Sequence, residues 1–124
     1  MGLQRTISFT AESRPTWDSI RAAFGAFAES PVVRMIDDLP AFPDERPEPA
    51  WRELRISLSG GMVTIRAVPS GWECVIWGNA DDALRRAWDI ACWAIASTGQ
   101  GKIVLETGES VGSDEFRSTH LDAR

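Results

Sequence analysis

Residues 51–78 read WRELRISLSGGMVTIRAVPSGWECVIWG. Apolar and polar residues alternate through three short runs, and the breaks between the runs fall at Gly60-Gly61 and Ser70-Gly71. Alternation is the period of a strand with one buried face, and a glycine pair between two such runs is typical of a hairpin turn. This stretch therefore predicts a three-stranded antiparallel meander.

A two-residue turn at Gly60-Gly61 sorts the first two strands into one apolar face and one polar face, as a correct register should. The predicted apolar pairs are Leu54 with Ala67, Ile56 with Ile65, and Leu58 with Val63. The predicted polar pairs are Arg55 with Arg66 and Ser57 with Thr64. A second turn at Ser70-Gly71 adds Cys74 and Ile76 to the apolar face, and Glu73, Val75 and Trp77 to the polar face.

The chain before the meander predicts a strand and a helix. Residues 3–10 alternate as a half-buried strand does. Thr16 is a suitable N-cap, and apolar residues follow it at helical spacing as far as Ala28. Residues 31–38 stay ambiguous, because they either continue this helix or start a second piece.

The segment 37–50 differs in composition from its surroundings. It holds four of the seven prolines and five acidic residues, so regular structure is not expected there. We expect an acidic, proline-rich surface loop held by three apolar anchors, Leu39, Phe42 and Trp51. A linker is the alternative interpretation.

The chain after the meander predicts a second helix and a last strand. Asn79 is the expected N-cap, and Gly99 and Gly101 supply the stop. Residues 102–107 read as a strand, and residues 111–124 are polar and acidic, which predicts a flexible tail.

The order of these elements predicts one α+β domain over residues 1–110. It is a two-layer β-α-β-β-β-α-β chain with two helices on one face of a mainly antiparallel sheet. The arrangement resembles a ferredoxin-like fold with an added strand, and that resemblance implies no activity.

Composition excludes several functional classes. The 124 residues are 44% hydrophobic and 25% charged, which suits one core, and the acidic net charge of −5 argues against nucleic acid and anionic membranes as partners. There is no apolar leader and no run of eighteen apolar residues, so we expect a cytoplasmic protein. Twelve arginines against one lysine are associated with GC-rich bacterial genomes, which favours a bacterial source.

The residue set predicts no catalytic residue, no metal site and no cofactor. His120 is the only histidine, and seventeen residues separate Cys74 from Cys92, which is not a zinc-ligand spacing. Both cysteines lie in apolar runs and are expected to be buried thiols, although a disulfide stays open. Residues 97–102 lack the first glycine and the Ser or Thr of a phosphate-binding loop.

The polar face of the meander is the first candidate binding surface. Its predicted residues are Arg55, Arg66, Trp77, Ser57 and Thr64, and Arg and Trp are common in binding hot spots. Like charges opposite each other destabilise a sheet unless they are neutralised, and Glu53 and Glu73 are the predicted neutralising groups. The alternative is that the 37–50 loop covers this face.

The second helix supplies another candidate. Twelve residues without a charge separate Asp89 from Lys102. At 100° per residue, Trp93 lies about 140° around the axis from Trp88, so the two rings cannot face the same sheet. Ala96 extends this second apolar face, which predicts a two-fold homodimer through Trp93 and Ala96. The alternative is that the first helix covers Trp93.

These observations predict a non-catalytic bacterial interaction or regulatory module, of adaptor or toxin-neutralising type, that binds a protein partner. The alternative is a small-molecule binding domain or small enzyme that holds an anionic ligand with Arg55 and Arg66. A third hypothesis places partner binding on the 37–50 segment.

Overall fold

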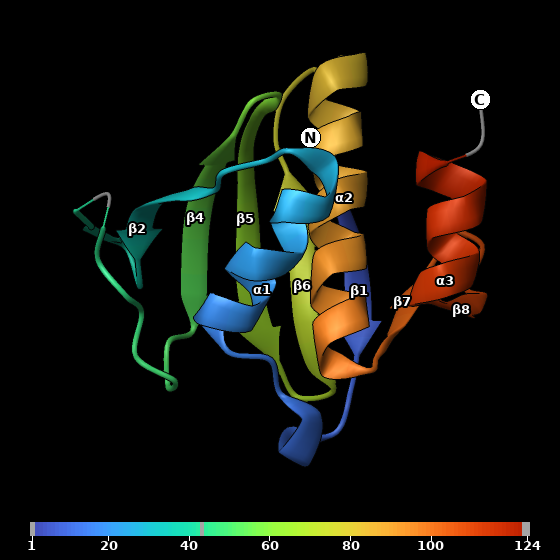
Figure 1. Cartoon of the computed structure of the whole chain (residues 1–124), viewed down its shortest axis with the longest axis horizontal. Coiled ribbons are helices and arrows are strands. Elements are labelled where there is room, and N and C mark those ends of the chain that lie inside the picture. Colours follow the sequence, from blue (N-terminus) through green and yellow to red (C-terminus); the bar gives the residue numbers. More distant parts are fainter. Residues whose placement is uncertain (1, 43, 123–124) are drawn as a thin grey trace.

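The computed structural model describes residues 2–42 and 44–122, and predictions that fall on Met1, Pro43 and residues 123–124 lie outside the described residues. Within those ranges, eight strands form one sheet in the order β3-β2-β4-β5-β6-β1-β7-β8 (Figure 1). Every neighbouring pair of strands is antiparallel. The predicted α+β class and antiparallel sheet are confirmed, whereas the finer ferredoxin-like arrangement is not.

The strands and helices follow one another along the chain with short connections, except for residues 41–52 between β3 and β4. The strands are β1 (Leu3–Ser8), β2 (Val32–Ile36), β3 (Leu39–Pro40), β4 (Glu53–Leu58), β5 (Gly61–Val68), β6 (Gly71–Ile76), β7 (Lys102–Val104) and β8 (Ser110–Gly112). The helical segments are η1 (Ala11–Ser13), α1 (Trp17–Phe24), η2 (Gly25–Phe27), α2 (Asp82–Gly99), α3 (Ser113–Phe116) and η3 (Arg117–Leu121). The sequence predicts five strands, and the structure adds β2, β3 and β8 in the described part of the chain.

The meander β4-β5-β6 has the predicted strands, but both turns lie one residue earlier than predicted. Leu58 pairs with Gly61, so the first turn is Ser59-Gly60, and cross-strand partners shift by two residues. Arg55 therefore lies opposite Thr64, and the predicted pairing of Arg55 with Arg66 is wrong. A shift of two residues leaves every side chain on its original face, because the side-chain period of a strand is two.

Packing against α2 explains the position of the first turn. A Cβ atom on Gly60 would lie 2.2 Å from the carbonyl oxygen of Ala83, close to the start of α2. Only a residue without a side chain allows the turn to approach the helix so closely. This contact lies between parts of the chain that are distant in sequence, so hairpin propensity alone could not reveal it.

The two long helices begin at capping residues. Thr16 caps α1 as predicted, and Thr16 and Ser19 form a reciprocal capping box. The N-cap of α2 is Asp81, whose carboxylate accepts a hydrogen bond from the backbone N–H of Leu84 at 2.8 Å, so the prediction of Asn79 is wrong. Among the described helices, none combines the length and apolarity needed to cross a bilayer.

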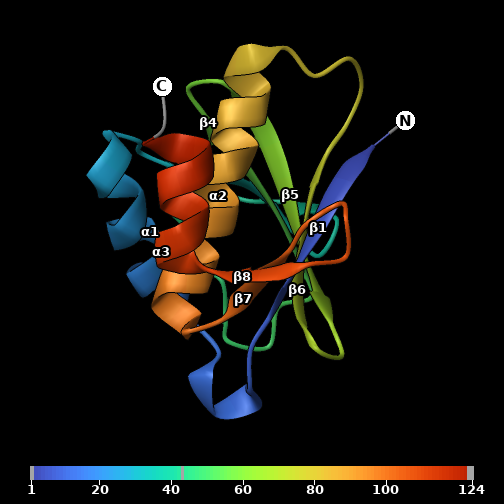
Figure 2. The ribbon, with the colours of Figure 1, turned by 90° about the vertical axis from the view of Figure 1, so that its right-hand side faces the viewer.

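The core lies between the sheet and α2, with α1 packed beside α2 (Figure 2). Its largest fully buried side chains include Trp72, Phe24, Ile20, Leu54, Ile56, Ile65 and Ile95. Cys74 and Cys92 are both buried and free, which confirms the expectation of buried thiols.

The predicted flexible tail is instead an ordered part of the fold over residues 110–121. Strand β8 pairs with β7, and α3 continues into the wider turn η3, which packs against α2 (Figure 2). Phe116 and Leu121 are buried, and Arg86 of α2 donates to the carbonyl oxygen of Leu121 at 3.5 Å. Three buried apolar side chains, Val111, Phe116 and Leu121, thus hold a segment whose polar composition suggested disorder.

The 37–50 segment also departs from its prediction. Residues Asp37 and Asp38, both with positive φ, form a tight turn that joins β2 to the short strand β3. Of the three predicted anchors only Trp51 is buried, whereas Leu39 and Phe42 are largely exposed. Backbone pairing in the β2-β3 hairpin, rather than apolar anchoring by Leu39 and Phe42, holds the start of this segment.

Candidate functional site

The predicted recognition residues lie on the outer face, which we define as the face of the sheet turned away from α2. Cross-strand pairing arranges this face in rows. Arg55 lies opposite Thr64 in one row, and Glu53, Arg66 and Glu73 lie side by side in the next. The structure therefore places both arginines on one face, in neighbouring rows rather than as a direct pair.

Carboxylates balance both guanidinium groups. Glu53 accepts hydrogen bonds from Nε of Arg55 and from Nε of Arg66, each at 3.3 Å. Glu73 lies 3.7 Å from Nη1 of Arg66, and Asp38 lies 3.8 Å from Nη2 of Arg55. Glu53 and Glu73 are the neutralising groups that the sequence indicates, and they leave little uncompensated positive charge here.

An exposed apolar pair lies beside this ion network. The side chain of Trp77 is 53% exposed and that of Met62 is 46% exposed. Arg66 stacks on Trp77, with 5.2 Å from its Cζ to the ring centroid. Met62 was not predicted as a site residue, although its outward position in the alternating run of β5 was the signal that could have identified it.

The two predicted hydroxyl groups on this face do not serve as expected. Thr64 is buried, so its hydroxyl is not presented to a partner. Ser57 lies opposite Met62 and accepts a hydrogen bond from Nε of Arg34 at 3.0 Å. The exposed groups of the outer face are therefore the aromatic and thioether side chains and the ion network.

The predicted dimer surface on α2 is covered by the chain itself. Trp93 is only 8% exposed and Ala96 is fully buried. The ring of Phe27 meets Trp93 edge to face at 5.2 Å, and the guanidinium of Arg117 lies 5.1 Å from the Trp93 centroid. The interpretation of Trp93 and Ala96 as an oligomer interface is wrong. The alternative was that the first helix covers Trp93, and the covering groups are Phe27 of η2, directly after α1, and Arg117 of η3.

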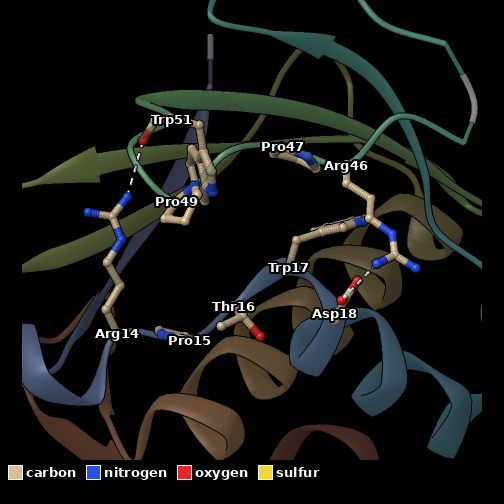
Figure 3. Close-up of a pocket in the computed structure, with 9 residues that line it drawn as sticks. All are labelled: Arg14, Pro15, Thr16, Trp17, Asp18, Arg46, Pro47, Pro49 and Trp51. Atoms are coloured by element: carbon tan, nitrogen blue, oxygen red, sulfur yellow. Dashed lines mark hydrogen bonds and ion pairs between the residues drawn. The ribbon is translucent and has the colours of Figure 1, made fainter.

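Sequence reasoning missed a cleft between the start of α1 and the segment 46–51 (Figure 3). The cleft has a volume of about 270 Å³ and is lined by Arg14, Pro15, Thr16, Trp17, Asp18, Arg46, Pro47, Pro49 and Trp51. Its two walls are some thirty residues apart in the sequence. The only signal in the sequence was the concentration of proline, tryptophan and arginine in both segments.

Arginines stand at the two ends of this cleft (Figure 3). Nη2 of Arg14 donates to the carbonyl oxygen of Trp51 at 3.2 Å, and its guanidinium lies 5.7 Å from the Trp51 ring and 5.6 Å from the Trp72 ring. Arg46 pairs with Asp18 at 3.5 Å, and both of these side chains are exposed. Apolar walls with charged ends are features of small-molecule sites.

Sequence reasoning also missed a buried cation. Arg5 is 7% exposed and forms ion pairs with Asp89 of α2 and with Glu106, the latter at 3.0 Å. Its guanidinium also lies 3.8 Å from the centroid of the Trp88 ring. Two carboxylates and an aromatic ring hold this buried guanidinium, so we assign it to the fold rather than to binding.

Across residues 2–42 and 44–122, no three His, Cys, Asp or Glu side chains gather as a metal ion would require. His120 stacks on Phe116 with 4.2 Å between ring centroids.

Comparisons with protein-family models, with curated proteins and with solved structures found no match to this chain. Function must therefore be inferred from the geometry of the outer face and of the cleft.

Proposed function

We propose that this chain is a non-catalytic binding module, of adaptor or toxin-neutralising type, whose outer face binds a protein partner through an apolar contact. The observation that carries this proposal is the exposure of Trp77 and Met62 beside an ion network that is already neutralised. Tryptophan is strongly enriched among residues that dominate binding energy.

The arrangement of the outer face favours tight contact at a low entropic cost. Arg66 is held between Glu53 and the Trp77 ring. The guanidinium and the indole are therefore already partly ordered before a partner binds. Ordering of side chains is one of the costs that binding must overcome. A partner that covers Trp77 and Met62 with aliphatic or aromatic groups would remove both from water.

Charge on the outer face favours a neutral contact rather than an anion. Arg34, Arg55 and Arg66 are matched in number by Asp38, Glu53 and Glu73. A free phosphate or carboxylate would have to compete with Glu53 for both of the arginines that it bridges. The alternative, an anionic ligand held by Arg55 and Arg66, therefore has weaker support than a protein partner.

Differential affinity capture followed by calorimetry tests the proposal. The wild-type chain and two variants, Trp77→Ala and the matched control Phe42→Ser, serve as baits in a lysate of the native host, and any protein retained is then purified. Phe42 is an exposed aromatic residue, 76% exposed, outside the outer face. We expect Trp77→Ala to weaken the affinity for the purified partner by about 30-fold. We expect Phe42→Ser to leave it unchanged.

The thermodynamic signature distinguishes the contact type. Burial of Trp77 and Met62 predicts a negative heat-capacity change and an affinity that changes little with salt. A steep loss of affinity with salt would instead support the anionic alternative.

A partner that binds Trp77→Ala as well as wild type, or capture that retains no specific protein, would contradict the proposal. A dimer in sedimentation that Trp77→Ala dissociates would identify a second copy as the occupant instead of another protein.

A further inference from the structure

We infer that the cleft in Figure 3 is a binding site for a small aromatic carboxylate. The cleft shares no lining residue with the outer face, so the inference stands apart from the proposed protein partner. Three properties of the cleft carry it: the flat apolar walls, the size, and the sign of the charge at its ends.

Flat apolar side chains form the walls of the cleft. Trp17 and Trp51 are largely buried and present only part of their rings to the opening. The rings of Pro47 and Pro49 line the same wall as Trp51, opposite Trp17. Figure 3 shows these side chains around an open space above Thr16. Planar and ring surfaces of this kind favour an aromatic ring over a branched or strongly polar group.

The size of the cleft, about 270 Å³, suits a ligand with a single ring and a short substituent. A dinucleotide or a folded peptide segment needs far more room. A benzene ring with a short acid side chain is of the appropriate size.

The charge at the ends of the cleft favours an anion. Among the residues that line the cleft, two guanidiniums, those of Arg14 and Arg46, outnumber the one carboxylate, that of Asp18. Asp18 is already paired with Arg46, so Arg14 is the cation with donors to spare. Arg14 uses Nη2 on the Trp51 carbonyl, and its other N–H groups can bind a carboxylate.

Arg14 is also held in position before any ligand arrives. The hydrogen bond to the Trp51 carbonyl and the rings of Trp51 and Trp72 restrict its guanidinium. A fixed guanidinium loses less freedom on binding than a flexible lysine would. The first turn of α1 adds the positive end of a helix dipole on the same side of the cleft.

The experiment uses the full chain and three probes: phenylacetate, its neutral amide phenylacetamide, and acetate. Binding is followed through the indole N–H signals of Trp17 and Trp51 in proton–nitrogen NMR spectra, which Trp17→Phe and Trp51→Phe assign. We expect phenylacetate to shift both signals saturably below about 10 mM. We expect the amide to bind at least about 10-fold more weakly, because it lacks the charge-assisted hydrogen bond. Acetate should not saturate.

Arginine variants locate the anion. Arg14→Gln should weaken phenylacetate binding by about 10-fold or more, and Arg14→Lys should restore part of the affinity. Arg85→Gln, on the exposed surface of α2, is the matched control and should bind as wild type does. Equal affinity for phenylacetate and phenylacetamide, unshifted Trp17 and Trp51 signals, or full binding by Arg14→Gln would each overturn the inference. The comparison of acid with amide on the wild-type chain decides the matter even if Arg14→Gln does not fold.

Discussion

Asp37 shows how much one side chain contributes to the hairpin beside the outer face. Its carboxylate accepts backbone N–H groups from Arg52 at 2.7 Å and from Glu53 at 2.9 Å. These two hydrogen bonds lower the pKa of Asp37 from its ordinary value of 3.8, since they favour the charged form. Asp37 thereby ties the β2-β3 turn to the start of β4, where Glu53 bridges the two arginines.

The lowered pKa predicts a dependence of stability on acid. The unfolded chain binds this proton at a higher pH than the folded chain does, so the contribution of Asp37 is fully present above the unfolded value near 3.8. It is lost as pH falls through the lower, folded-state pKa. Urea unfolding of wild type and Asp37→Asn between about pH 6 and pH 2.5 should show a steeper acid loss in wild type. Parallel curves would contradict this role of the carboxylate.

At the scale of elements, close backbone contacts decide how the turns pack. Gly60 lies in the β4-β5 turn, where a Cβ atom would meet the backbone of Ala83 at 2.2 Å. Gly25, at the end of α1, has ordinary helical angles and open space around its Cα. Gly60 is therefore required because a side chain would collide with α2, whereas the space around Gly25 would accept a side chain.

Substitution of these glycines should have opposite effects on stability. Gly60→Ala forces the turn away from α2 and should lower the free energy of unfolding by about 2 kcal/mol. Gly25→Ala should raise it by about 0.4–1 kcal/mol, because alanine reduces the freedom of the unfolded chain at a site where it fits. Urea denaturation of both variants measures the difference. If Gly60→Ala left the free energy of unfolding unchanged, the turn would be able to move away from α2 without cost.

At the scale of the whole molecule, Arg5 joins three regions of the chain. It lies on β1, pairs with Asp89 of α2, and pairs with Glu106 in the connection that leads to β8. Its guanidinium lies 5.3 Å from the ring of Phe116 in α3. A buried charge is stable only with good partners, so these contacts depend on one another.

Removal of Arg5 should therefore destabilise the whole fold. Arg5→Ala leaves Asp89 without its partner, and we expect the free energy of unfolding to fall by about 3 kcal/mol. The double variant Arg5→Met with Asp89→Leu should recover most of this loss, because it removes both charges and retains apolar volume. Denaturant unfolding of wild type, the single variant and the double variant provides the measurement. A double variant no more stable than Arg5→Ala would show that the charges themselves are needed.

Local patterns in the sequence were sufficient for the faces of the meander and for the cap of α1. Alternation depends only on the period of the strand, so Ile56 and Ile65 are buried in either register. The Thr16 cap acts within one turn of helix, and neighbouring residues contain all the information it needs. Buried thiols at Cys74 and Cys92 followed in the same way from the apolar runs around them.

Only the tertiary structure decided which residues pair across strands and whether residues 110–121 are ordered. It also decided what covers Trp93 and whether the cleft forms. Each of these depends on contacts between distant segments: Gly60 with Ala83, Arg86 with Leu121, Phe27 with Trp93, and Arg14 with Trp51. Composition and periodicity report which side of an element is buried, because burial repeats along the chain. They do not report which segment provides the cover, because that choice depends on the packing of the whole chain.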